Sequence, residues 1–302
     1  MLGWLHNRIS AHRGSAALCA AFLGLLFFAA FAPVVSAASP AIAAQELAIA
    51  GLQVKAWIPE RGTPGPWPVL IFSHGFDGCN TQSTFLLEAL VKSGYAIFAP
   101  NHQDAGCGMM IWPTRPDAPF RDPGDWTENT YKDRRDDIRK LLDALSADPR
   151  YSVAPFDWNH VGLIGHSLGG YTVLGLAGAW PSWKDSRIKA VLALSPYAAP
   201  FVLHHSLDGI NVPVMYQGGT RDIGITPSVK KRDGAYDQTR SAKYFVEFDG
   251  AGHLAWTDLR DSEHAAIVEY SRAFLDHYLK GSDFPKSLAK PQKGVAAIRI
   301  SG

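Results

Sequence analysis

The sequence has almost no excess of charge of either sign, and it contains only three cysteines. Its 302 residues include 29 lysines and arginines against 28 aspartates and glutamates. A nucleic-acid-binding surface needs a basic excess and an acidic tail needs an acidic run, so neither is expected. No internal repeat and no linker divides the chain. With 47% hydrophobic and 19% charged residues, the composition is that of a globular protein.

Residues 1–37 have the pattern of a secretory signal peptide. Arg8 and Arg13 give a positive start, residues 16–31 are apolar, and small residues follow Pro33. Because Pro33 and the small residues interrupt the apolar run, we expect this segment to be removed rather than kept as a membrane anchor. The sequence therefore predicts a secreted or periplasmic protein, which contacts a membrane only if the segment is retained.

The rest of the chain, residues 38–302, alternates apolar runs with amphipathic stretches. Continuous apolar runs predict strands buried on both faces, and stretches with a helical period predict helices between them. This alternation predicts a single α/β domain, with a mainly parallel central sheet and helices on both faces. The expected strands are 46–58 (one or two edge strands), 69–72, 95–99, 161–164, 188–194, 212–216 and 243–248, and the expected helices are 81–93, 127–146, 168–179 and 262–280.

Three regions carry separate expectations, and for the last two more than one interpretation is open. Within helix 127–146, the charged residues 134–137 lie off the apolar stripe and are expected to face solvent. Residues 101–127 form a long loop rich in aromatic residues, which is either functional or misassigned. Residues 282–302 are weakly patterned and form either a tail or a late edge strand.

The segment Gly165-His166-Ser167-Leu168-Gly169 follows an apolar run and opens a helical pattern. A Gly-x-Ser-x-Gly order between a strand and a helix is typical of a nucleophile elbow, in which a tight turn exposes one serine at the edge of a sheet. Glycines flank the serine because the crowded turn leaves no room for a Cβ. We therefore predict Ser167 as the nucleophile, the alternative being a structural turn with an inert serine. His166 is expected to pack under the turn.

A serine hydroxyl is a weak nucleophile and needs a base, together with a third group that orients the base. His253 follows the last expected strand and Asp222 follows the strand before it, so both lie with Ser167 at the carboxyl edge of the sheet. We predict His253 as the base and Asp222 as the acid, in the chain order serine, aspartate, histidine. Asp208 is a competitor for the acid, and Asp249 is too close in sequence to His253 to be preferred.

The negative charge that develops on the substrate oxygen needs fixed hydrogen-bond donors. Leu168 directly follows the nucleophile, and Phe76 lies in the loop after strand 69–72. We predict that the backbone N–H groups of these two residues form an oxyanion hole. The alternative for the segment His74-Gly75 before Phe76 is an ordinary glycine turn.

These motifs together resemble the α/β-hydrolase superfamily. The resemblance rests on His74-Gly75-Phe76 after a strand, the elbow at 165–172, and the segments 218–222 and 250–253. Within the superfamily they look like the bacterial dienelactone-hydrolase-like and platelet-activating-factor-acetylhydrolase-like group, which borders the secreted polyester hydrolases. The resemblance covers roughly residues 46–280. It implies a serine esterase that uses Ser167, Asp222 and His253, with no metal or organic cofactor.

One departure from the family matters. True dienelactone hydrolases use a cysteine nucleophile, so Ser167 argues against lactone hydrolysis itself. The predicted function is a secreted serine hydrolase that cleaves carboxylic esters, small or lipid-like, through an acyl-enzyme. A phospholipase or acetylhydrolase, a polyester hydrolase or a peptidase could use the same groups. A non-catalytic binding protein is the remaining alternative.

Two further groups of residues are weaker candidates. Trp112 and Tyr197 could line an apolar acyl pocket, although packing of the aromatic loop on its own body is equally compatible with the sequence. His102 and Asp104 do not complete a metal-ligand set, so no metal is expected.

The cysteines carry a separate prediction. Cys19 lies inside the apolar run of the first 37 residues rather than after it, which argues against a lipoprotein. Cys79 and Cys107 remain in a chain bound for an oxidising compartment. Because the strands that precede them are neighbours in the α/β-hydrolase fold, the resemblance implies a disulfide between them. Two free thiols are the alternative.

Overall fold

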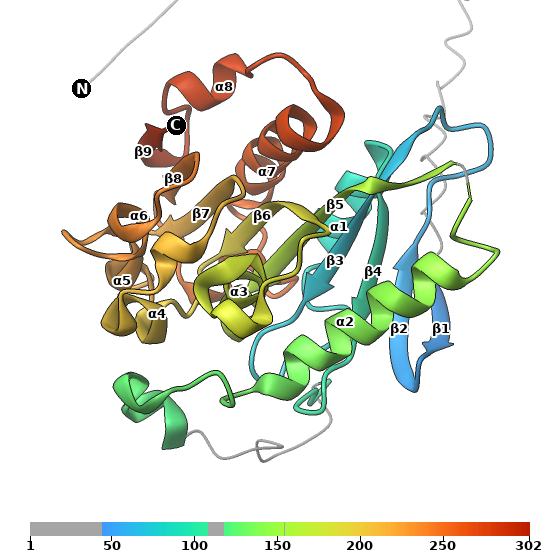
Figure 1. The fold of residues 1–302 in the computed structure, drawn as a ribbon. Coiled ribbons are helices and arrows are strands. Elements are labelled where there is room, and N and C mark those ends of the chain that lie inside the picture. Colours follow the sequence, from blue (N-terminus) through green and yellow to red (C-terminus); the bar gives the residue numbers. More distant parts are fainter. Residues whose placement is uncertain (1–43, 108–117, 154) are drawn as a thin grey trace, which may run out of the picture. The chain divides into compact units, whose positions relative to one another are not determined.

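The computed structural model describes residues 44–302 except 108–117 and 154 (Figure 1). The predicted signal peptide, residues 1–37, and the pocket candidate Trp112 therefore lie outside the described residues. Among the helices that are described, none is long and apolar enough to cross a membrane.

The described residues form a nine-stranded sheet in the order β1-β2-β4-β3-β5-β6-β7-β8-β9. Neighbouring strands from β4 to β8 are parallel, whereas β1, β2 and β9 run antiparallel to their neighbours. This arrangement confirms the predicted mainly parallel sheet. The strands are β1 (Gln45–Ile49), β2 (Leu52–Trp57), β3 (Trp67–Ser73), β4 (Ala96–Pro100), β5 (Phe156–His166), β6 (Ile188–Leu194), β7 (Val214–Gly219), β8 (Lys243–Phe248) and β9 (Val295–Ser301).

Strand β3 shows why the central strands are continuous apolar runs. All of its residues are buried, and successive side chains alternate between the two faces of the sheet. Val69 and Ile71 join one apolar cluster, whereas Leu70 and Phe72 join the other. Both faces therefore need apolar side chains. For this reason the strand lacks the alternation of apolar and polar residues that is typical of a strand with one exposed face.

Helices cover both faces of the sheet, as predicted (Figure 1). The apolar sides of α1 and α7 belong to one cluster, and those of α2 and α3 belong to the other. The helices are α1 (Thr84–Lys92), α2 (Lys132–Ala147), α3 (Leu168–Leu174, continued by a π-helical turn, Gly175–Ala179), α4 (Ala199–His204), α5 (Thr226–Lys230), α6 (Ala235–Gln238), α7 (His264–Lys280) and α8 (Lys286–Ala289).

The structure corrects the prediction that residues 134–137 of α2 face solvent. Arg135 and Asp136 are partly exposed and pair with each other. Arg134, however, is completely buried, and Asp137 is buried as well. A guanidinium and a carboxylate are stable in the interior only when they are paired and hydrogen-bonded, so the prediction failed because their partners lie far away in the sequence.

The C-terminal segment resolves into one of the two structures expected for residues 282–302. A short helix, α8, is followed by β9, which pairs antiparallel with β8 as an edge strand. The aromatic loop contains two short 3₁₀ turns, Ala118–Arg121 and Pro123–Asp125, and α2 begins at Lys132 rather than at residue 127.

Candidate active site

Ser167 occupies the sharp turn between the end of β5 and the start of α3. Its backbone has φ 55° and ψ −115°, in a region that side-chain-bearing residues rarely occupy. The two flanking glycines are required by close packing. A Cβ on Gly165 would lie 2.2 Å from the carbonyl oxygen of Gly169, and a Cβ on Gly169 would lie 1.9 Å from the carbonyl oxygen of Ser73. The turn therefore has the geometry of the predicted elbow.

The structure brings His253 and Asp222 to this serine. Nε2 of His253, in the 3₁₀ turn after β8, lies 2.9 Å from Oγ of Ser167. Oδ1 of Asp222, after β7, lies 3.3 Å from Nδ1 of the same histidine. The competing acids Asp208 and Asp249 are exposed at the surface, whereas Asp222 is buried. Three segments far apart in the sequence thus meet at the carboxyl edge of the sheet.

Ser195 is a fourth member of this group that sequence reasoning missed. It directly follows β6, with φ 41°, and its hydroxyl donates to Oδ2 of Asp222 over 2.6 Å. A carboxylate can only accept, so the Ser195 oxygen is left to accept Nδ1–H of His253, at 2.8 Å. This places the lone pair of Nε2 toward Ser167. Its position in the sequence could have identified it, because Ser195 follows a strand that ends at the same edge of the sheet as the strands before Ser167, Asp222 and His253.

The surroundings of Asp222 keep it ionised. Burial alone would raise the pKa of this carboxyl, but hydrogen bonds from His253, Ser195 and Thr226 outweigh burial and lower the pKa. Thr226 begins α5 and donates to Oδ2 over 2.8 Å. The carboxylate is therefore charged at neutral pH, where it can hold the imidazole in one tautomer and stabilise its protonated form.

His166 lies beneath the elbow, as the sequence predicted. Its Nε2 is 2.9 Å from the carbonyl oxygen of His253, and burial together with the nearby His253 lowers its pKa to about 3. The ring is therefore neutral at physiological pH and donates to that carbonyl. It supports the loop that carries His253, and in the described residues its other ring nitrogen, Nδ1, has no hydrogen-bond partner.

The two predicted oxyanion donors come from different elements. Leu168 begins α3, and Phe76 is in the loop after β3. Gly75 packs so closely on the elbow that a Cβ there would lie 3.3 Å from Cβ of Ser167. Within the described residues, the N–H groups of Phe76 and Leu168 donate no hydrogen bond. One of these N–H groups directly follows Ser167 in the chain, and the other follows Gly75, which packs against the elbow.

Cys79 and Cys107 form a disulfide with a Cα–Cα distance of 4.8 Å. Cys79 belongs to the loop after β3 and Cys107 to the loop after β4, so the bond ties together two loops at the carboxyl edge of the sheet.

Tyr197 lies close to the nucleophile, but its ring packs inside an aromatic cluster. Its N–H donates to the carbonyl oxygen of Ser167 over 2.9 Å, and its hydroxyl donates to the carbonyl oxygen of Phe120. Its ring centroid is 5.0 Å from those of Phe120 and Trp126. The aromatic loop therefore packs on the protein's own body here.

The candidate metal ligands are already paired with protein groups. Asp104 binds the guanidinium of Arg134, and His102 lies 3.0 Å from Asp137. In the part of the chain that the structure describes, no group of three or more His, Cys, Asp or Glu side chains could hold a metal ion.

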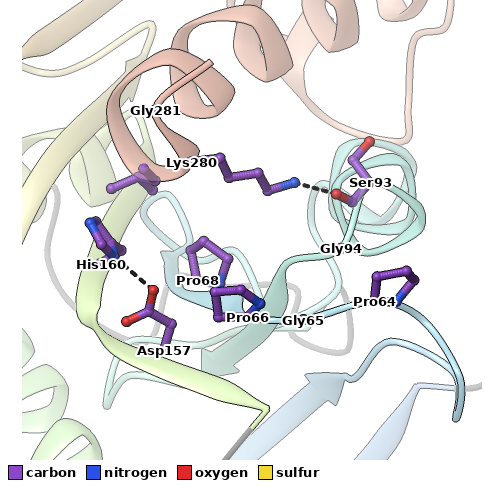
Figure 2. Close-up of a pocket in the computed structure, with 11 residues that line it drawn as sticks. Pro64, Gly65, Pro66, Pro68, Ser93, Gly94, Asp157, His160, Lys280 and Gly281 are labelled. Atoms are coloured by element: carbon purple, nitrogen blue, oxygen red, sulfur yellow. Dashed lines mark hydrogen bonds and ion pairs between the residues drawn. The ribbon is translucent and has the colours of Figure 1, made fainter.

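Two cavities differ in their relation to the site. One of about 450 Å³ lies at the amino end of the sheet, near Pro68 of β3 and near Asp157 and His160 of β5 (Figure 2). Lys280 and Ser93 close another side of it and are hydrogen-bonded to each other. Since the candidate nucleophile follows the opposite end of β5, this cavity is remote from it.

The second cavity, of about 790 Å³, lies at the carboxyl edge. Residues that contribute to it come from the loops after β3 and β4, from the start of α1 and from the segment after His253, and include Asp77, Gln82, Phe85, Cys107, Leu254 and Leu259. It is thus formed by the same loops that carry one oxyanion donor and the base.

A family model described as the alpha/beta hydrolase family matches residues 70–285, which include all of the residues brought together at Ser167. The chain belongs to the alpha/beta hydrolase family. The match begins in β3 and ends after α7, so the parallel part of the sheet and its edge loops are those of a hydrolase. No curated protein matches the chain.

Proposed function

We propose that this hydrolase is a secreted serine esterase that cleaves carboxylic esters through an acyl-enzyme. The observation that carries the proposal is the linked set of contacts at Ser167. Nε2 of His253 is 2.9 Å from its Oγ, and Nδ1 of the same ring is held by Ser195 and Asp222. A base with its far side fixed in this way is what a serine nucleophile requires.

The proposed reaction has two halves. Oγ of Ser167 attacks the ester carbonyl while Nε2 of His253 takes its proton, and the resulting oxyanion accepts hydrogen bonds from the N–H groups of Phe76 and Leu168. The carbon–oxygen bond to the alcohol then breaks, and His253 gives the alcohol its proton. A water molecule, deprotonated by His253, attacks the acyl-enzyme in the same way and releases the carboxylic acid and free Ser167.

Several features support an ester substrate and an extracellular location. A serine nucleophile within the dienelactone-hydrolase-like and platelet-activating-factor-acetylhydrolase-like group fits an esterase or acetylhydrolase better than a lactone hydrolase. The disulfide and the signal-peptide pattern of residues 1–37 fit a secreted or periplasmic protein.

Fluorophosphonate labelling tests whether the serine is reactive. The wild-type protein should be labelled, Ser167→Ala should not, and Ser146→Ala, which removes an exposed hydroxyl of α2, should be labelled like wild type. Absence of wild-type labelling would refute the proposal. Rates on nitrophenyl esters of increasing acyl length, compared with phospholipid, polyester and peptide substrates, then separate an esterase from the other hydrolases that use the same groups.

A further inference from the structure

We propose that Arg134 is a positioning residue for the oxyanion hole: its buried guanidinium holds the peptide between Gly75 and Phe76 so that the Phe76 N–H faces Ser167. This inference rests on the proposed esterase function.

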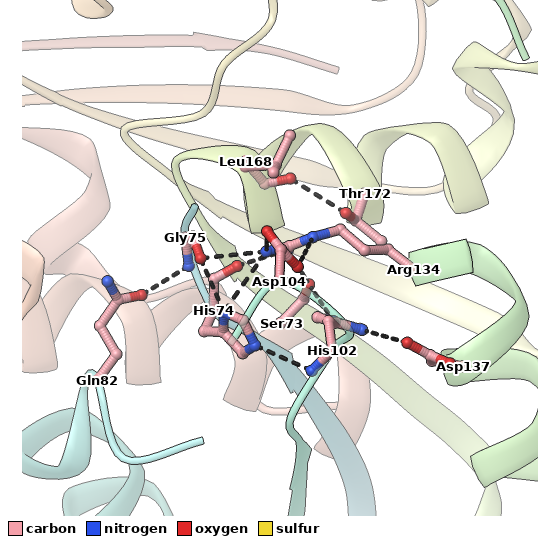
Figure 3. Close-up of polar contacts among 10 residues, drawn as sticks. All are labelled: Ser73, His74, Gly75, Gln82, His102, Asp104, Arg134, Asp137, Leu168 and Thr172. Atoms are coloured by element: carbon pink, nitrogen blue, oxygen red, sulfur yellow. Dashed lines mark hydrogen bonds and ion pairs between the residues drawn. The ribbon is translucent and has the colours of Figure 1, made fainter. Parts of the chain in front are cut away.

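The guanidinium of Arg134 reaches from α2 to the loop after β3 (Figure 3). Nη1 donates to the carbonyl oxygen of His74 over 2.7 Å, and Nη2 donates to that of Gly75 over 3.1 Å. Its other donors bind both carboxylate oxygens of Asp104, at 2.7 and 3.0 Å. Both side chains are fully buried, so this fork is shielded from water.

The orientation of the Phe76 N–H follows from peptide geometry. In a trans peptide the C=O and N–H groups point in opposite directions, because the unit is planar. The carbonyl of the Gly75–Phe76 peptide points to Arg134, so its N–H points away from the guanidinium. The preceding peptide is fixed at both ends, since its carbonyl binds Arg134 and its N–H, that of Gly75, donates to Oε1 of Gln82 over 2.7 Å.

The side chain of His74 also binds the carbonyl oxygen of Gly75. Its Nε2 accepts the N–H of His102 at 3.0 Å, so Nδ1 carries the proton and donates to the carbonyl oxygen of Gly75 over 2.7 Å. Burial, with the positive charge of Arg134 nearby, lowers the pKa of His74 well below its usual value, which keeps the ring in this neutral form. The Gly75 carbonyl also accepts Gly78 N–H, which closes a turn.

The turn alone could orient Phe76, so the role of the guanidinium needs a test that separates the two. Lysine at position 134 keeps the charge but lacks the planar fork that spans Asp104 and two carbonyl groups. If Arg134 positions the donor, Arg134→Lys should weaken binding of the oxyanion while leaving neutral ester binding nearly unchanged. Arg135→Lys is the matched control, because Arg135 is on the same helix but pairs with Asp136.

The measurement uses an alkyl trifluoromethyl ketone with a ¹³C carbonyl. Oγ of Ser167 adds to this carbon and its proton passes to His253, which gives a hemiketal oxyanion without a leaving group. In Arg134→Lys we expect inhibitor affinity and kcat to fall about 10- to 100-fold and KM to change less than about 3-fold. The hemiketal pKa, read from the ¹³C shift, should move upward. Arg135→Lys should match wild type in all four.

Rates are expressed per serine titrated by fluorophosphonate, so partial misfolding does not imitate the effect. Asp104→Asn, which loosens the guanidinium and keeps it in place, provides a second variant with the same expected direction. A wild-type hemiketal pKa and kcat in either variant would overturn the role of Arg134. Failure of the esterase proposal itself would give a different result, because the wild-type protein would then form no hemiketal with the trifluoromethyl ketone.

Discussion

The hydroxyl of Ser195 donates to Oδ2 of Asp222 over 2.6 Å, which makes it the shortest contact of the candidate acid. Because the same oxygen lies 2.8 Å from Nδ1 of His253, the base and the acid are joined more closely through Ser195 than directly, at 3.3 Å. Removing this hydroxyl should therefore disturb both of its neighbours.

We expect Ser195→Ala to lower kcat about 10-fold and the free energy of unfolding by about 1–3 kcal/mol, since a hydrogen bond to a buried charged group is lost. Steady-state kinetics and urea unfolding measure the two effects. Ser228→Ala, which removes a hydroxyl that donates to the carbonyl of Ile225, is the control. A Ser195→Ala protein with wild-type kcat would exclude a role for this hydroxyl in the site.

The stability effect of Ser195→Ala should depend on pH in a defined direction. Folding lowers the pKa of Asp222 from 3.8, and Ser195 is one of the groups responsible. Such a carboxylate stabilises the native state above its unfolded pKa and loses that contribution as the pH falls through its native pKa. The difference in unfolding free energy between wild type and variant should be full at pH 7 and shrink below pH 3.8. A difference that grows in acid would contradict this account.

His166 should make the protein sensitive to mild acid. Its pKa falls from 6.5 to about 3 on folding, so between these values the unfolded chain binds a proton that the native state does not. Stability should fall with decreasing pH by up to about 1.4 kcal/mol per pH unit from this group. His166→Gln keeps a donor for the carbonyl of His253 and should flatten the profile between pH 6.5 and 4, measured by urea unfolding. The exposed His204→Gln should keep the wild-type slope.

The elbow glycines should tolerate no side chain. In Gly169→Ala the added Cβ would lie 1.9 Å from the backbone oxygen of Ser73, which cannot move without displacing β3. We expect a loss of more than about 3 kcal/mol in unfolding free energy, or no soluble protein. Gly252→Ala is the matched change, because a Cβ there meets nothing within 4 Å and φ is −99°. Equal stability of the two variants would mean that the elbow is less crowded than described.

The disulfide should stabilise the fold by restricting the unfolded chain. Cys79 and Cys107 are separated by 28 residues, a loop length for which the chain-entropy model gives about 3–4 kcal/mol. The double variant Cys79→Ser/Cys107→Ser should lose stability of this order in chemical unfolding. Thiol titration of unreduced protein that lacks residues 1–37 should find no free thiol. Two titratable thiols would show that the bond does not form.

The sequence was sufficient for those features that depend on local pattern. The buried run in β3 and the alternation of strands with helices identify a parallel sheet with two covered faces. Both patterns reflect which apolar side chains are buried away from water. The meeting of Ser167, Asp222 and His253 could be predicted because all three follow strands, and the carboxyl ends of parallel strands lie at one edge of the sheet.

The features that could not be predicted depend on partners distant in the sequence. Arg134 has a helical position that an exposed arginine would equally occupy. Its burial is stable because it binds Asp104, 30 residues earlier, and two backbone carbonyl groups of the loop after β3. Ser195 carries a common side chain, and its role comes from the positive φ and from two partners in the segments after β7 and β8. The periodic pattern of apolar residues in a sequence reveals neither distant side-chain partners nor a positive φ.

The antiparallel pairing of β9 with β8 determines where the chain leaves the sheet. Ser301 pairs with Lys243 at the start of β8, whereas His253 follows the other end of that strand. A tag, fusion partner or surface linker attached after Gly302 would therefore emerge from the end of the sheet opposite Ser167. Protein immobilised on a solid support in this way should present the edge that carries Ser167 outward, so that even a polymeric substrate could reach it.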